Sequence, residues 1–279
     1  MAEASDNKSC GICPHNCIIP EGAFGLCGIR KNSGGKLIPT HYGVVSSIAV
    51  DPIEKKPLYR FYPGRPILSI GGYSCNMRCP FCQNHHIATG HNQIDQSKKS
   101  SKISPGKIVK MALDVTDNIG VAYTYNEPLI NYEFLMDCAK MIRGAGLCNV
   151  LVTNGFINPK PLKALLPFID AANIDLKGFT EDYYADLHGK LSPVMETVAL
   201  AHKHCHVEVT TLIVPGKNEN HIEPLAKWLA SLNASIPLHI SRFFPRFQYA
   251  DMSPTPVETI YRLCDAAKKH LMFVYPGNV

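Results

Sequence analysis

The stretch PILSIGGYSCNMRCPFCQN, residues 66–84, joins a short apolar run to a loop that carries three cysteines. The run PILSIGG, residues 66–72, has the length and composition of a buried β-strand. Cys75, Cys79 and Cys82 follow at a CxxxCxxC spacing, which lets three thiolates face one centre if the chain loops around it. Active sites of parallel-strand barrels lie at the carboxyl ends of the strands, so this stretch indicates a strand together with its site.

After this stretch the chain alternates between β-branched apolar runs and segments of helical periodicity. The further predicted strands are residues 120–125, 149–155, 171–177, 206–216 and 237–243. A helix is expected over 104–118, with Ser104 as N-cap and Pro105 at its first position. Such alternation predicts a parallel sheet with right-handed crossovers. Six such units are fewer than the eight of a closed barrel. We therefore expect an α/β fold, an incomplete (β/α)6 TIM-like barrel, with a doubly wound sheet as the alternative.

The beginning of the chain has a different composition. The first forty or so residues are rich in Cys, Gly and Pro and short of periodic structure, which fits a small metal-stapled module better than a hydrophobic core. Residues 41–64 begin as a strand and become an extended connection punctuated by prolines. We therefore divide the chain into residues 1–64, a Cys-rich N-terminal module and connection, and residues 65–279, the partial barrel.

Composition limits the partners and the compartment. The net charge is +5, and the twelve histidines and dispersed lysines form no basic stripe, so we expect no nucleic-acid partner. No apolar segment approaches the roughly 20 residues that span a bilayer, and the N-terminus lacks a signal-peptide apolar region. We expect a soluble, cytoplasmic protein with no membrane partner. In that reducing compartment, closely spaced cysteines are better interpreted as metal or redox ligands than as disulfides.

The three-cysteine loop leaves open which metal it binds. A structural zinc site needs a fourth ligand, which His85 or His86 could supply. Iron–sulfur clusters are also held by thiolates at short spacings. We favour a 4Fe–4S cluster in which cysteine holds three irons and the fourth iron is open to a small molecule, because an open position is typical of a catalytic site.

The segment CNMRCPFCQN resembles the signature of the radical S-adenosylmethionine (radical SAM) enzymes. In that family the open iron binds the amino and carboxylate groups of SAM, and electron transfer from the cluster produces a 5′-deoxyadenosyl radical. The resemblance implies that Phe81 lies against the adenine. It also matches Asn126 and Glu127 to a Gly-Gly-Glu-type segment that binds the methionine amino group, a suitable role for a carboxylate. Here Tyr125 and Asn126 replace the two glycines.

Other strand ends add candidates for cofactor binding. The third strand ends at Thr153, and the fourth carries Asp175 and Lys177. The resemblance places Asp175 near the ribose or a bound cation, and the lysine could pair with the methionine carboxylate. The sixth strand carries His239 in an otherwise apolar run. Each has a structural alternative: Thr153 could be a satisfied polar group at the barrel mouth, and His239 a core histidine bonded to the backbone.

The resemblance narrows to one branch of the family. The segments CGICPHNC, DPIEKKPLYRFYPG, YTYNEP, TNGF and NIDLKGF together resemble the radical SAM member of the AmmeMemoRadiSam system, a relative of the pyruvate formate-lyase activases. The match runs from Cys10 to Asn278. Members typically have Gly where this chain has Ser74, and they usually continue past the segment GNV into a tail with another CxxC pair.

Four cysteines, Cys10, Cys13, Cys17 and Cys27, make a complete thiolate set near the N-terminus. We favour structural zinc here, with a second iron–sulfur cluster as the rival that could relay electrons or hold substrate. If the CxxC tail of other members normally helps to complete this site, His15 becomes a substitute ligand.

These features together predict an enzyme that cleaves SAM reductively and abstracts a hydrogen atom. A glycyl-radical-activase-like reaction on a protein or peptide is the leading hypothesis. The alternatives are a small-molecule substrate, or a metal-binding interaction protein that has lost the chemistry. A reducing protein such as flavodoxin or ferredoxin is the implied partner.

Overall fold

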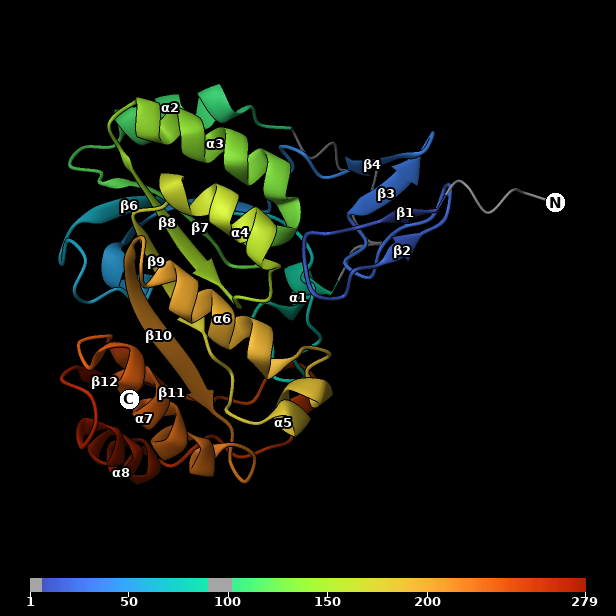
Figure 1. Cartoon of the computed structure of the whole chain (residues 1–279). Helices are drawn as coiled ribbons and strands as arrows, with labels where there is room; N and C mark the ends of the chain where they lie inside the picture. The colour runs from blue at the N-terminus through green and yellow to red at the C-terminus, as the bar shows by residue number, and fades with distance from the viewer. Residues whose placement is uncertain (1–6, 90–101) are drawn as a thin grey trace.

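A single eight-stranded sheet organises the barrel in the computed structural model, which describes residues 7–89 and 102–279. Its strands lie in chain order, and neighbours are parallel except for β5, which pairs antiparallel with β6 (Figure 1). The strands are β5 (Ser47–Pro52), β6 (Pro66–Gly71), β7 (Gly120–Thr124), β8 (Cys148–Thr153), β9 (Ala171–Asp175), β10 (His206–Ile213), β11 (Leu238–Arg242) and β12 (Val274–Gly277).

Helices follow the strands and cover the outside of the sheet (Figure 1). They are α1 (His85–Ala88), α2 (Pro105–Asp114), α3 (Tyr132–Gly144), α4 (Pro159–Leu165), α5 (Glu181–Asp186), α6 (Leu191–Ala201), α7 (Ile222–Asn233) and α8 (Val257–Lys268). Short 3-10 turns occur at Ile53–Lys55, Pro128–Asn131, Leu166–Phe168, Glu219–His221 and Phe247–Tyr249. As predicted, the side chain of Ser104 caps α2 by accepting a hydrogen bond from Lys107 N.

The predicted incomplete barrel is confirmed. The six predicted strands are β6 to β11, and two further strands flank them. In the described residues β5 and β12 lie at opposite ends of the strand order, so the sheet does not close. No helix of the described part of the chain is long and apolar enough to cross a membrane.

The connection between β5 and β6 fills the interior of the barrel at the amino ends of the strands. Ile53 and Leu58 pack there against Ile67, Ala122 and Val150 in a buried cluster. The backbone of the same connection donates hydrogen bonds to a buried glutamate of β10, Glu208, from Tyr59 N and Arg60 N at 3.1 and 2.8 Å. The predicted boundary between residues 64 and 65 therefore separates segments that share one sheet and one core.

The Cys-rich module consists of two small antiparallel pairs. The strand β1 (Lys8–Ser9) pairs with β2 (Ile18–Ile19), and β3 (Arg30–Ser33) pairs with β4 (Lys36–Pro39). These strands lie together at one side of the barrel (Figure 1).

An ion pair and an apolar contact dock this module on the barrel. The buried Arg30 forms a bidentate pair with Glu133 of α3. Next to it, Cys27 and Ile29 form a buried cluster with Ile130. The asparagine that precedes α4, Asn158, donates to the carbonyl oxygens of Gly11 and Cys13 as well. The module is therefore held on the barrel by several kinds of contact.

Candidate active site at the carboxyl ends of the strands

A cavity of about 360 Å³ lies where the parallel strands end. The loop after β6 and the ends of β7, β8 and β9 supply most of its polar lining. Every predicted catalytic and cofactor-binding residue except His239 lines it: Cys75, Cys79, Phe81, Cys82, Asn126, Glu127, Thr153, Asp175 and Lys177. The structure thus brings together residues that are more than a hundred positions apart in the sequence.

The cysteine loop is held in shape by one asparagine. Asn126 Oδ1 accepts a hydrogen bond from Gly72 N at 2.8 Å, and its Nδ2 donates to the carbonyl oxygens of Tyr73 and Ser74. Ser74, which stands where the family has glycine, has a φ of 70°. This left-handed conformation favours glycine. The hydrogen-bonding groups of Asn126 are thus used on the cysteine loop, which makes it a positioning residue.

The three thiols of the loop are half-buried acids with raised pKa values. Burial raises the pKa of Cys79 to about 11, although the positive charge of Lys177 opposes the shift. Burial also raises the pKa of Cys75 and of Cys82. Metal binding needs thiolates, so loading this loop releases protons.

Glu127 is a fully buried carboxylate with three donors. Leu129 N and Thr153 Oγ1 donate to Oε1 at 3.0 and 2.7 Å, and Asn154 N donates to Oε2 at 2.8 Å. A carboxylate has about four acceptor positions, so one remains for a further donor. Burial raises the pKa of Glu127 to about 7. Thr153 acts on this carboxylate and so positions it.

Asp175 and Lys177 form an ion pair on the cavity wall. Lys177 Nζ lies 2.6 Å from Asp175 Oδ2. Burial lowers the pKa of Lys177, but the charge of Asp175 and its hydrogen bond outweigh this effect, so the pKa is raised and the side chain is a cation. The wall therefore presents one positive and one negative group next to the cysteine loop.

Phe81 forms an apolar side of the same cavity. It is buried and packs in a cluster with Tyr183, Leu187, Val214 and Phe243. Its ring is thus fixed by residues from other loops, as a wall for a flat group requires.

His239 does not line this cavity. Its Nε2 lies 2.6 Å from Glu208 Oε2, and its ring packs between Tyr59 and Tyr275. Glu208 is buried and also contacts His206 Nε2 at 2.9 Å. The structure therefore places His239 in the packed interior, as in the structural alternative for this residue.

Sequence reasoning did not single out a charged cluster on the cavity wall. Tyr125 has a φ of 71°, and its hydroxyl donates to Asp51 Oδ2 at 2.7 Å. Lys56 Nζ donates to the same oxygen at 2.8 Å and lies 4.7 Å from the Tyr125 ring centroid. Lys55 contacts Asp51 Oδ1 at 3.3 Å. The replacement of a family glycine by Tyr125 was the available signal for this cluster.

Asn154 was also missed as a contact of the cysteine loop. Its Nδ2 lies 3.5 Å from Cys75 Sγ and donates to Asn76 Oδ1 at 2.9 Å. An asparagine after a strand is a common turn residue, so its type alone did not reveal this contact.

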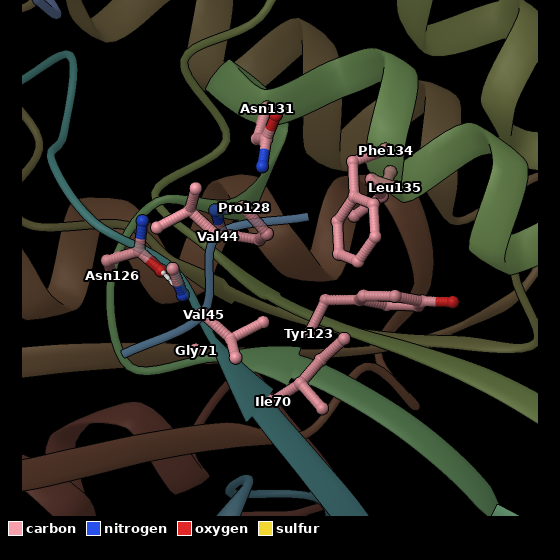
Figure 2. A pocket seen from close by; sticks show the side chains of 11 residues that line it. Val44, Val45, Ile70, Gly71, Tyr123, Asn126, Pro128, Asn131, Phe134 and Leu135 are labelled. Atoms are coloured by element: carbon pink, nitrogen blue, oxygen red, sulfur yellow. Dashed lines mark hydrogen bonds between the residues drawn. The ribbon is translucent and has the colours of Figure 1, made fainter. Parts of the chain in front are cut away.

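A second, much smaller cavity lies behind Asn126. It measures about 30 Å³ and is lined mainly by apolar side chains, among them Val44, Ile70 and Phe134 (Figure 2). Its lining includes no charged residue, so it has no group that would recognise a charged cofactor.

The four N-terminal cysteines also meet. Cys10, Cys13, Cys17 and Cys27 line one small cavity together with His15. In residues 7–89 and 102–279, no three His, Cys, Asp or Glu side chains converge closely enough to enclose a single metal ion. His15 Nε2 lies 2.7 Å from Asn76 O, so its ring is already bonded to the cysteine loop.

A cavity of this composition at the end of an incomplete barrel can be compared with known proteins. The family model described as Radical SAM superfamily matches residues 69–229, more than half of the chain. The chain belongs to the radical SAM superfamily. The members of this family use a 4Fe–4S cluster and SAM, and the three cysteines that line the cavity fit that cluster.

The chain is also similar to a curated protein and to solved structures. An uncharacterised protein of Methanocaldococcus jannaschii, MJ0808, is 43% identical over 98% of this chain and 82% of its own length. Among solved structures, Streptococcus suis SuiB bound to S-adenosylmethionine has a TM-score of 0.55 and 13% identity over 76% of this chain and 51% of its own. TYW1 with a lysine-pyruvate adduct bound has a TM-score of 0.51 and 15% identity over 73% and 74%. These two structures share the fold.

Proposed function

We propose that this radical SAM protein abstracts a hydrogen atom from a protein or peptide, in the manner of a glycyl-radical activase. The observation that carries the proposal is the gathering of the cysteine loop, Glu127 and the Asp175–Lys177 pair around one cavity. When bound, the cluster and SAM supply the radical chemistry. This chain's own residues bind the cluster and SAM, orient them and enclose them in the cavity.

Each group of the cavity matches one part of SAM. The remaining acceptor position of Glu127 suits an N–H group of the methionine amino group, and Lys177 suits the methionine carboxylate. Asp175 can accept from ribose hydroxyls, and Phe81 offers an apolar face for adenine. These assignments follow from charge and hydrogen-bonding type.

The open sheet supports a large substrate. In the described residues β5 and β12 are not paired with each other, so the sheet is open at its two edges. Ser241 of β11 and Asn278, which follows β12, also line the cavity. One structural neighbour is SuiB bound to its precursor peptide SuiA, with a TM-score of 0.54 and 12% identity.

A small-molecule substrate is the second candidate. A cavity of about 360 Å³ is within the range of small-ligand sites. Both candidates bind SAM in the same way, and they differ only in the substrate that lies next to it. Both candidate functions need a reducing partner such as flavodoxin or ferredoxin.

Isotope transfer tests the proposal. Cells are grown on deuterated glycine, and their extract is divided into a protein fraction and a filtrate of small molecules. Each fraction is incubated anaerobically with the reconstituted protein, dithionite and SAM. We expect deuterium in 5′-deoxyadenosine with the protein fraction alone. Transfer from the filtrate alone would contradict a protein substrate. The variant Cys75→Ala should abolish transfer, and Cys148→Ala, a lone cysteine outside the cavity, should not.

A further inference from the structure

We infer that the four N-terminal cysteines hold a second iron–sulfur cluster that delivers electrons to the cluster at Cys75, Cys79 and Cys82. This inference rests on the proposed function, because it assigns the route by which that site is reduced. It replaces structural zinc, the role that the sequence favours, by a redox role.

The four thiols face one place. Cys10, Cys13 and Cys27 are buried, with 7%, 8% and 9% of their surfaces exposed, and all four line one cavity. The backbone brings them there, since Cys10 N donates to Cys17 O at 2.8 Å. Four thiolates are the complete ligand set of a 4Fe–4S cluster.

A single side chain connects the two cysteine sets. Asn76 follows Cys75 directly and is 3% exposed. Its side chain is a hydrogen-bond partner of the Cys13 thiol, and its Oδ1 lies 3.9 Å from Cys75 Sγ. One amide therefore contacts a ligand from each set. Electron transfer between two metal sites benefits from a short, packed path of this kind.

Three further contacts fix the module against the same loop. Ser74 Oγ donates to Cys27 O at 2.5 Å, and Arg78 Nη2 donates to Leu26 O at 2.7 Å. His15 Nε2 lies 2.7 Å from Asn76 O. The module thus contacts the cysteine loop at alternate residues, which holds the path through Asn76 rigid.

The arrangement of the thiols in the described residues does not match a single-ion site. Zinc binds sulfur at about 2.3 Å, so its four tetrahedral sulfurs lie about 3.8 Å apart. A 4Fe–4S cluster places a cube of iron and sulfide between its thiolates and holds them farther apart. In the described residues neither cysteine set converges as a single ion requires. The N-terminal set shares this property with the set that holds the family's cluster.

The surface of the module suits an acidic electron carrier. Lys8, Lys31 and Lys36 lie in it, and Glu21 is the one acidic residue between positions 7 and 40. Ile18 and Leu26, close to the cysteines in sequence, are 71% and 60% exposed. In each turnover the carrier loses one electron, the N-terminal cluster passes one electron on, and the Cys75 cluster gains it.

Iron counting tests the second cluster independently of any activity. After anaerobic reconstitution of the full chain we expect about eight irons per chain, and about four in a variant with Cys75, Cys79 and Cys82 all changed to Ser. A variant with Cys10→Ser and Cys27→Ser should also keep about four. Cys148→Ser is the matched control and should keep about eight. One zinc per chain, with no iron in the triple variant, would overturn the inference.

Donor dependence tests the electron route. The Cys10→Ser/Cys27→Ser variant and an Asn76→Leu variant are compared with the wild type for SAM cleavage driven by reduced flavodoxin or by dithionite. We expect both variants to lose at least tenfold more activity with flavodoxin than with dithionite. Equal loss with both donors would contradict the relay. A variant that loses the four irons held by Cys75, Cys79 and Cys82 is misfolded. In that case the comparison is made with Cys13→Ser instead.

Discussion

Two residues of the site occupy conformations that normally belong to glycine. Ser74 and Tyr125 have φ values of 70° and 71°, and the family has glycine at both places. In each case the side chain is bonded to a segment that precedes the cysteine loop: Ser74 to Cys27 O, and Tyr125 to Asp51 of β5. A left-handed conformation costs a non-glycine residue roughly 1–2 kcal/mol. The side-chain bonds offset this cost and tie the site to the N-terminal part of the chain.

Substitutions of Tyr125 test this strain. Tyr125→Ala and Tyr125→Gly both remove the bond to Asp51, but only glycine relaxes at a φ of 71°. We expect the glycine variant to be more stable than the alanine variant by about 1 kcal/mol, measured by urea unfolding. At an ordinary strand position alanine is the more stable of the two. An alanine variant as stable as the glycine variant would show that the position is unstrained.

The carboxyl group of Glu127 gives cofactor binding a pH dependence. Its pKa of about 7 means that it is largely protonated below neutral pH and charged above it. Because a carboxylate accepts hydrogen bonds from the N–H groups of the methionine amino group better than a carboxylic acid does, SAM should bind more tightly as the pH rises through 7. Glu127→Gln should weaken binding by about tenfold to a hundredfold at pH 8, from the loss of a charged hydrogen bond. It should also remove the pH dependence.

Calorimetric titration of SAM between pH 6 and 8 measures both effects. Thr153→Val is a useful companion variant, since it removes one donor to Glu127 and leaves the charge in place. A wild-type affinity that does not change across pH 7 would contradict the role of Glu127.

At the scale of the elements, the ends of the strands could be predicted from the sequence and the depth of their side chains could not. Asp175, Lys177 and Glu127 were found because polar residues interrupt apolar runs at strand ends. His239 follows the same pattern but lies in the packed interior with Glu208. The alternation of a strand reveals which face a residue is on, but not how far along the barrel axis it lies. The connection that fills the amino ends comes from residues distant in sequence, and no local pattern predicts it.

The buried carboxylate of β10 should make the fold sensitive to acid. Burial raises the pKa of Glu208, but bonds from His206, His239 and two backbone amides outweigh this and lower it to about 2. The contribution of Glu208 to the free energy of unfolding is therefore present above its ordinary pKa of 4.5 and is lost as the pH falls towards 2. The shift corresponds to about 3 kcal/mol.

Urea unfolding between pH 6 and 2.5 measures this contribution. Glu208→Gln should lower the free energy of unfolding at pH 6 by about 3 kcal/mol. The free energy of unfolding of this variant should also fall less than that of the wild type as the pH is lowered. The exposed Glu196→Gln is the matched control and should follow the wild type. A Glu208→Gln variant with the acid profile of the wild type would contradict the account.

At the scale of the whole molecule, the chain combines a partial barrel with a module that is fixed to its active end. The CxxxCxxC spacing and the strand–helix alternation predicted the barrel, the cluster and the cavity. The contacts between the module and the cysteine loop could not be predicted, because they are made by backbone atoms and by asparagines that have many possible partners. Asn76 is an example, since its side chain contacts Cys13 of the module as well as the neighbouring Cys75.

Reductive cleavage of SAM by the reconstituted protein tests the central claim most directly. With iron, sulfide and dithionite under anaerobic conditions, we predict formation of 5′-deoxyadenosine. Cys79→Ala should abolish it, and the lone buried Cys264→Ala should retain it. A protein with a fully formed cluster that produces no 5′-deoxyadenosine, or a Cys79→Ala variant that cleaves SAM at the wild-type rate, would contradict the account.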